Sequence, residues 1–333
     1  MKKYAVYGVG NALVDTEFEV PDSFFTEHGI EKGCMTLVSR EQQQHLTNIL
    51  SREHEIKKRC GGGSACNTLF ALTNFGGKAF YACKVADDEI GAFFLGELGD
   101  ENIDTSVSKK EEGVSGQCII MVSPDAERTM NTYLGVSETL SISELDFNII
   151  NNCEYVYIEG YLVTSPSAKS AIIKLKEFAK KNGVKVAFTF SDPAVVQHFR
   201  EPVNEVLKEG IDLLFCNEQE LKIWAGTENF EDACEAMKKI ANQFVITRGP
   251  RGALLFDGEN HINISANKAV AVDTNGAGDM FAGAFLYGIT AGFSFDKSGE
   301  LASSASAKVV TRFGSRLTPE QHKEIKSQVL GNS

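Results

Sequence analysis

Residues 273–279, with the sequence Asp-Thr-Asn-Gly-Ala-Gly-Asp, combine small residues with a carboxylate at the expected start of a helix. Gly276 and Gly278 allow the N–H groups of Ala277, Gly278 and Asp279 to point at an anion, and the helix dipole adds partial positive charge there. Asp279 falls in the first turn, where the dipole favours an ionised carboxylate that can receive a proton from an attacking hydroxyl. The segment therefore predicts a phosphate site with its own base. Alone, it would also fit tight packing and a helix cap.

A second glycine-rich segment, Gly61-Gly62-Gly63-Ser64, also precedes an apolar helical stretch, with Asn67 near its start. Glycines permit close approach of a ligand to the backbone, and an asparagine amide offers both a donor and an acceptor. Two such elements in one chain suggest two ends of one ligand site.

The two segments resemble the two signatures of the ribokinase-like (PfkB) family of sugar and nucleoside kinases. The first signature spans residues 61–77 and the second residues 273–288, and the resemblance covers nearly all of the 333 residues. Within the family the chain is most similar to adenosine kinases, through residues 9–15 and 160–166. The resemblance implies ATP and Mg²⁺ as cofactors, with a monovalent cation as a further candidate, and a small-molecule nucleoside or sugar as the acceptor.

Short apolar runs alternate with amphipathic segments along the chain. Ala168, Ile172, Leu175 and Ala179 repeat with helical spacing, which predicts a crossover helix. The runs that read as buried strands are residues 4–9, 79–85, 155–158, 184–190, 213–216 and 244–247. Repeated strand–helix units predict an α/β fold, a three-layer, doubly wound and mostly parallel sheet with ligands at the carboxyl ends of its strands.

Two stretches, residues 16–38 and 113–135, lack crossover helices of convincing length, and residues 117–122 and 128–134 read as a hairpin. By resemblance these stretches form a small β-sheet lid over the sugar, and residues 1–15, 39–112 and 136–333 form the large α/β domain. A lid would exclude water, which is a competing phosphoryl acceptor. The alternative is a surface hairpin that extends the main sheet.

The acceptor end is predicted around Asp15, because an ionised carboxylate accepting two hydrogen bonds fits vicinal hydroxyls. By resemblance Asp15 holds the ribose 2′- and 3′-hydroxyls, and Tyr161 and Leu162 lie beside the purine. The remaining residues of the implied sugar cradle are Asn11, Gly62, Gly63, Ser64 and Asn67. Outside the family context, Asp15 would read as a solvated turn carboxylate and Tyr161 and Leu162 as core residues.

At the nucleotide end, Asn217 and Glu220 match the Asn-x-x-Glu of the family, which acts around Mg²⁺ and phosphate mainly through water. Arg128 on the proposed lid matches an arginine that reaches the transferring phosphoryl group. The residues implied to contact the ATP phosphates and ribose are Thr247, Gly249 and Gly252. An acidic helix start, a solvated arginine and a simple hairpin turn are the respective alternatives.

The net charge of −12 argues against nucleic acid as a partner and also repels ATP, so local cations such as Arg128, Arg248 and Arg251 must offset it. No apolar run approaches the ~18 residues of a membrane span. Eight cysteines without a zinc-like spacing indicate a reduced, cytoplasmic protein. Monomer and homodimer both fit.

The predicted function is transfer of the ATP γ-phosphoryl group to the primary 5′-hydroxyl of a nucleoside, with adenosine as the favoured acceptor. Alternatives within the enzyme class are ribokinase, fructokinase and ketodeoxygluconate kinase. A carboxylated sugar is disfavoured, since Asn11, Asp15 and Asn67 offer it no cation. The alternative from another class is a nucleoside sensor that binds without turnover.

Overall fold

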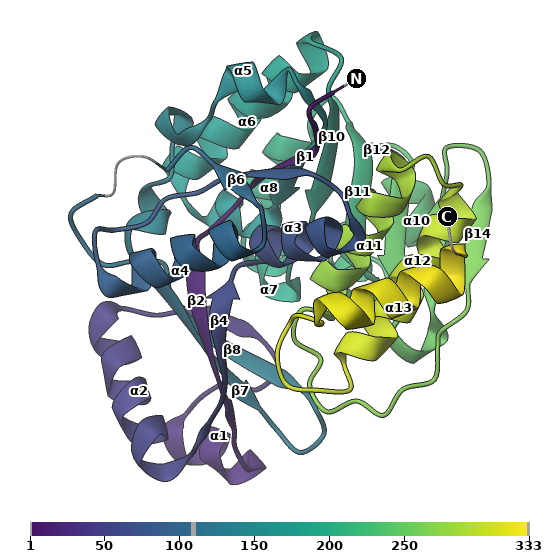
Figure 1. Ribbon diagram of the computed structural model, residues 1–333. Helices are drawn as coiled ribbons and strands as arrows, with labels where there is room; N and C mark the ends of the chain where they lie inside the picture. The colour runs from purple at the N-terminus through teal and green to yellow at the C-terminus, as the bar shows by residue number, and fades with distance from the viewer. Residues whose placement is uncertain (1, 108–110, 332–333) are drawn as a thin grey trace.

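The computed structural model describes residues 2–107 and 111–331, and within them a nine-stranded sheet forms the middle layer (Figure 1). The strands from β6 to β12 run parallel, and β13 and β14 add an antiparallel edge. Their order is β14 (His261–Ile264), β13 (Ala253–Phe256), β12 (Ala241–Thr247), β11 (Ile211–Asn217), β10 (Lys185–Thr189), β9 (Cys153–Glu159), β1 (Tyr4–Val9), β5 (Ala79–Ala82) and β6 (Asp104–Thr105). The predicted mostly parallel α/β sheet is confirmed.

Helices cover both faces of this sheet, so successive side chains of a strand enter two different cores. On β9, for example, Val156 and Ile158 join one core and Tyr155 and Tyr157 the other. The first core is covered by α5 (Phe147–Ile150), α6 (Pro166–Lys181), α7 (Pro193–His198), α8 (Arg200–Leu207), α9 (Glu218–Ala225) and α10 (Phe230–Met237). The second is covered by α3 (Ser64–Phe75), α4 (Glu89–Asp100), α11 (Ala277–Thr290), α12 (Phe295–Val309) and α13 (Pro319–Leu330). Short 3-10 turns span Gly135–Thr139, Ile142–Glu144, Gly160–Thr164 and Gly249–Arg251.

A second sheet of five strands lies beside the first (Figure 1). Its order is β3 (Met35–Leu37), β8 (Arg128–Tyr133), β7 (Gly116–Val122), β2 (Leu13–Glu19) and β4 (Ile56–Gly62). One face is covered by α1 (Asp22–His28) and α2 (Arg40–Glu53), where Phe24 and Leu50 pack with Phe18 and Met121 of the strands. The predicted hairpin is present as β7 and β8, but it belongs to this separate sheet. The alternative of a hairpin that extends the main sheet is therefore wrong.

The predicted boundaries of the small sheet are too narrow. The sequence places residues 39–62 in the large domain, yet α2 packs on the small sheet and β4 pairs with β2 within it. The sequence does not reveal β4 because its first four residues, Ile56 to Arg59, are all exposed and show no alternation of apolar and polar side chains. Whether the small sheet moves as a lid stays a prediction.

No helix in the described part of the chain is long and apolar enough to cross a bilayer.

His322 of α13 is fully buried against α3, which carries the Gly61–Ser64 segment at its start. Its ring packs edge-on against Phe75, with 4.7 Å between centroids, and its Nδ1 lies 2.9 Å from the carbonyl oxygen of Thr318. Among the described residues, Nε2 has no hydrogen-bond partner. Burial lowers the pKa of His322 from 6.5 to about 4. The folded protein therefore holds a neutral imidazole behind the helix that carries the site.

This burial predicts acid sensitivity of the fold. Because the pKa of His322 is lower in the folded than in the unfolded chain, the unfolded chain binds the proton first as the pH falls below 6.5. We expect the free energy of unfolding to drop by about 2 kcal/mol more in the wild type than in His322→Leu between pH 7 and pH 5. Urea titrations of both proteins at the two pH values measure this. An equal drop in both would show that the histidine is not the proton acceptor.

Candidate active site

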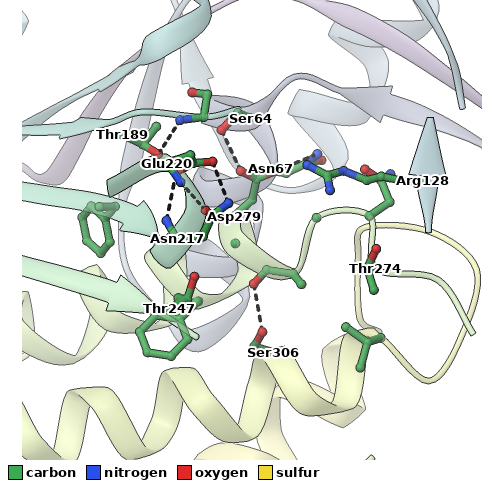
Figure 2. Close-up of a pocket in the computed structure, with 18 of the residues that line it drawn as sticks. Ser64, Asn67, Arg128, Thr189, Asn217, Glu220, Thr247, Thr274, Asp279 and Ser306 are labelled. Atoms are coloured by element: carbon green, nitrogen blue, oxygen red, sulfur yellow. Dashed lines mark hydrogen bonds between the residues drawn. The ribbon is translucent and has the colours of Figure 1, made fainter. Parts of the chain in front are cut away.

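A cavity of about 920 Å³ lies where the carboxyl ends of the main-sheet strands face the small sheet. Residues that end or follow five parallel strands line it, namely Asn11, Glu159, Thr189, Asn217 and Thr247. The start of α11 and the connection that precedes it close another side (Figure 2). The cavity therefore occupies the edge of the sheet where the sequence predicts ligands.

The predicted phosphate segment begins α11 at the cavity. Gly276 is the N-cap with φ of +70°, and a Cβ there would lie 2.3 Å from Cβ of Ser315, so only glycine fits. Gly278 faces open space. The N–H of Ala277 differs from the prediction, since it donates to the carbonyl oxygen of Thr274 at 3.3 Å. The N–H groups of Gly278 and Asp279, which have no intrahelical acceptors at these positions, remain for an anion.

The two glycine-rich segments meet at Asp279. Ser64 Oγ donates to Asp279 Oδ1 at 2.6 Å, and Asn67 Nδ2 donates to Oδ2 at 3.4 Å (Figure 2). Burial raises the pKa of Asp279 above 3.8, against these two hydrogen bonds and the nearby charge of Arg128. The helix dipole, on which the sequence prediction of an ionised carboxylate rests, acts in the opposite direction from burial. A raised pKa makes this carboxylate a stronger base than one in water.

Asp15 lies on β2 at the cavity and is 5% exposed, so the reading as a solvated turn carboxylate is wrong. Burial raises its pKa to about 7, and the charge of Arg316 opposes this rise. Gly62 does not line the cavity, but a Cβ at Gly62 would lie 2.0 Å from Asp15 Oδ2. Gly63, with φ of +93°, has a similar constraint, because a Cβ there would lie 2.2 Å from the carbonyl oxygen of Asn11. The lack of a side chain at Gly62 and Gly63 thus leaves room for Asp15 and Asn11, which are predicted to bind the phosphoryl acceptor.

Glu159, at the end of β9, is a buried site residue that the sequence argument missed. Its Oε1 accepts from the backbone N–H of Asn11 at 2.7 Å and from Asn11 Nδ2 at 2.9 Å, and its Oε2 accepts from the N–H of Ala65 at 2.9 Å. Burial raises its pKa to about 7, against these bonds. Through its hydrogen bonds to Asn11 and Ala65, the Glu159 side chain links the end of β1 to the start of α3. An acidic residue directly after a buried strand and before Gly160 is the signal that could have identified it.

Of the two residues predicted beside the purine, only one reaches the cavity. Tyr161 lines it, and its hydroxyl donates to Asp192 Oδ2 at 3.4 Å. Leu162 is 1% exposed and packs in the main core, so its predicted substrate contact is wrong. The polypeptide turns there in a 3-10 helix, Gly160–Thr164, which points adjacent side chains in different directions.

Besides Asp15, the small sheet contributes Arg128 and an apolar wall to the cavity. Arg128 begins β8, is half-buried and lines the cavity, and Figure 2 shows it on the side of Asp279 opposite Asn217 and Glu220. The apolar lining residues from the small sheet and its exit are Leu13, Met35, Leu37, Cys118, Met130 and Leu134. Most of these went unpredicted, because short lid strands do not reveal which face they turn to the ligand.

At the nucleotide end, Asn217 and Glu220 form a reciprocal cap at the start of α9. Asn217 N and Nδ2 each donate to the Glu220 carboxylate at 2.9 Å, and Glu220 N donates back to Asn217 Oδ1 at 2.8 Å. Burial raises the pKa of Glu220 to about 7. Thr247, Gly249 and Gly252 also line the cavity, and their contact with ATP stays a prediction.

Two of the three predicted local cations are engaged elsewhere. Arg248 Nε and Arg251 Nη2 contact Glu218 Oε2 at 2.9 and 2.7 Å, and neither arginine lines the cavity. Among the described lining residues, Arg128 and Lys268 are the cations. The expectation that Arg248 and Arg251 offset the charge of ATP is therefore not supported by their positions.

The described part of the chain offers no protein cage for Mg²⁺. Across residues 2–107 and 111–331, no three His, Cys, Asp or Glu side chains are grouped to hold a metal ion. Each carboxylate oxygen of Glu220 already accepts one hydrogen bond but retains capacity for a second, from a water molecule. The arrangement fits a hydrated ion that Glu220 holds through water.

The small sheet also contacts the phosphate segment. Asn275 Nδ2 donates to Glu17 Oε1 of β2 at 2.9 Å, and Thr274 Oγ1 donates to the carbonyl oxygen of Ala126 in the β7–β8 turn at 3.1 Å. Glu17 is fully buried, and burial raises its pKa to about 8. No sequence motif marked Glu17, since its partner lies 258 positions away.

Comparison with known proteins agrees with this geometry. The chain matches the pfkB family of carbohydrate kinases over residues 33–322. The solved structure of adenosine kinase from Sinorhizobium meliloti has a TM-score of 0.93 and 31% identity, covering 98% of this chain and 99% of that chain. A probable sugar kinase from Rhizobium etli CFN 42 gives the same four values. The adenosine kinase of Schizophyllum commune is 24% identical over 354 residues, covering 99% of this chain and all of its own.

The match over most of the chain shows the family directly, and the structural relatives at 31% identity extend it over nearly the full length. The chain therefore belongs to the pfkB family of carbohydrate kinases, as a relative of adenosine kinases, and is a kinase that uses ATP to phosphorylate a hydroxyl group.

Proposed function

We propose that the protein transfers the γ-phosphoryl group of ATP to the 5′-hydroxyl of a nucleoside, with adenosine as the preferred acceptor. The observation that carries the proposal is the combination of a buried carboxylate, Asp15, with the apolar wall of the same small sheet. A ribose diol suits the carboxylate, and a planar base suits the wall formed by residues such as Met35 and Met130. A free sugar would leave that wall without an apolar partner.

The volume and the relatives support the same substrates. About 920 Å³ is near the upper end of small-molecule cavities and allows a nucleoside and a nucleotide to share the site. Relatives named adenosine kinase include those of Sinorhizobium meliloti and Schizophyllum commune. A ribokinase from Staphylococcus aureus is also similar, at 29% identity over 70% of this chain, so neutral sugars belong in any test.

In the proposed mechanism Asp279 accepts the proton of the acceptor hydroxyl. Ser64 orients the carboxylate through Oδ1, and the free N–H groups at the start of α11 stabilise charge developing on the phosphoryl oxygens. Arg128 brings positive charge from the lid to the same place. Glu220 and Asn217 would hold hydrated Mg²⁺, which supplies charge neutralisation to the ATP phosphates when bound.

Substrate preference is tested by measuring ADP release with adenosine, inosine, guanosine, cytidine, ribose and fructose at matched Mg-ATP. We expect the purine nucleosides to give kcat/KM values at least about 100-fold above those of the sugars, because a sugar cannot bury the apolar wall. Higher values for ribose or fructose would contradict the nucleoside assignment and support a sugar kinase. Binding of adenosine without ADP release from any acceptor would indicate a sensor.

Asp279→Asn tests the base. We expect kcat to fall about 100- to 10,000-fold while ATP still binds, since the amide keeps the shape but cannot take the proton. Stopped-assay turnover and calorimetric ATP binding measure the two quantities. Asp296→Asn is the matched control, because Asp296 occupies the first turn of the adjacent helix α12 and is exposed. Turnover of Asp279→Asn within tenfold of wild type would rule out the base assignment.

The pKa of Asp15, about 7, predicts a pH dependence of acceptor use. The ionised form binds the diol, so kcat/KM for the acceptor should decline as the pH falls through 7 and level off above it. Asp15→Asn should lower kcat/KM at pH 8 by about 10- to 100-fold, as expected for lost hydrogen bonds to a charged group. An acidic limb that persists in the variant reports on the other carboxyl groups of the site, namely the base Asp279, whose pKa burial also raises, and Glu159 and Glu220, whose pKa values are about 7. Wild-type kcat/KM in the variant would contradict the role of Asp15.

A further inference from the structure

Arg316 lies in the connection between α12 and α13, and its side chain is 10% exposed although it does not line the cavity. Nη1 donates to Glu97 Oε2 at 3.0 Å, Nη2 donates to the carbonyl oxygen of Gly61, and Nε donates to Asn67 Oδ1 at 3.3 Å. The guanidinium also lies over the ring of Phe70, 4.4 Å from its centroid. This arginine thus lies directly behind the acceptor end of the cavity.

The contact with Asn67 fixes which end of its amide faces the site. A guanidinium carries only donors, so the amide must present Oδ1 to Arg316. The opposite end, Nδ2, then points to Asp279 Oδ2 at 3.4 Å. If the amide were reversed, its NH₂ would face the donors of Arg316 and its oxygen would face a carboxylate, and both contacts would be repulsive. Arg316 therefore orients the Asn67 amide so that its NH₂ group, a hydrogen-bond donor, faces Asp279.

The positive charge of Arg316 also affects the pKa of Asp15, the carboxyl group proposed to bind the acceptor. Asp15 is surrounded by acidic groups, and the charge of Arg316 lowers its pKa against burial. The carboxyl groups that act in the opposite direction are those of Asp279, Glu97 and Asp273. Buried positive charge at this position therefore keeps more of Asp15 ionised near neutral pH.

We propose that Arg316 is a positioning residue for phosphoryl transfer, which holds Asn67 as a donor to Asp279 and supplies the buried positive charge behind the acceptor site. The inference rests on the proposed function for the roles of Asp15 and Asp279. It differs from a purely structural role, in which Arg316 would only fasten Gly61 and α4 to the start of α3.

The test uses Arg316→Gln, Arg316→Lys and the control Arg312→Gln, with the acceptor that gives the highest ADP release in the substrate panel. Arg312 is a matched arginine in the same connection, whose Nη1 contacts Gln321 Oε1 at 2.9 Å and not Asn67. We expect Arg316→Gln to lower kcat about 10- to 100-fold, as for a small misplacement of a catalytic group. It should also move the acidic limb of kcat/KM to higher pH. Arg316→Lys should restore the position of the limb, because it keeps the charge, but not the full kcat.

A double-mutant cycle with Asn67→Ala separates positioning from simple loss of stability. If Arg316 acts through Asn67, Arg316→Lys should have less than about a twofold effect on kcat in the Asn67→Ala background. An equal loss in both backgrounds, or an Arg316→Gln protein that melts earlier but keeps the wild-type kcat and pH profile, would overturn the proposal. If Arg316→Gln fails to fold, the cycle of Arg316→Lys with Asn67→Ala still tests whether Arg316 acts through Asn67. A failure of the proposed function would instead appear in wild type, as a preference for an acceptor other than a nucleoside.

Discussion

The geometry of the cavity depends on hydrogen-bond donors and positive charge that stabilise several carboxyl groups beside the proposed phosphate site. Burial is the largest influence on the pKa of Asp15, Glu159, Glu220 and Asp279, and it raises each of them. An isolated buried charge costs several kcal/mol, so such a cluster persists only where donors are already in place. The donors to Glu159, Glu220 and Asp279 come from the end of β1 and the starts of α3 and α9, and Arg316 acts on Asp15 through its positive charge. The parallel sheet matters to function because it brings these donors to one edge.

The same constraint links the two sheets. Glu17 of β2 accepts a hydrogen bond from Asn275, and Thr274 donates to the β7–β8 turn, so the connection that carries the phosphate segment is shaped by the small sheet. Withdrawal of that sheet would remove both contacts and Arg128 together. If the small sheet closes as a lid, as predicted, these contacts and Arg128 would reach the phosphate segment together with the cover that excludes water, which would favour transfer to the acceptor.

The sequence predicted what local patterns encode. Gly276 and Gly278 mark a helix start, apolar runs mark the buried strands, and polar residues after those strands fall at one edge of the sheet, so the motif residues do converge. Glu17 and Arg316 could not be found in this way, because their roles depend on partners 258 and 249 positions away. Strand β4 is not predicted from the sequence because half of it is exposed. The predicted substrate contact of Leu162 is wrong because a 3-10 turn points neighbouring side chains in different directions.

The two hydrogen bonds to Asp279 also distinguish its oxygens. The 2.6 Å contact from Ser64 engages Oδ1 strongly, whereas the 3.4 Å contact from Asn67 leaves Oδ2 weakly engaged. An incoming hydroxyl competes more easily for Oδ2, while Ser64 keeps the carboxylate plane fixed. The Asn67 amide, held by Arg316 with its NH₂ toward Asp279, lies on the Oδ2 side of the carboxylate. In the proposed mechanism this NH₂ group would donate to the carboxylate while Oδ2 takes the proton of the hydroxyl, and the buried charge of Arg316 would keep the amide in that orientation.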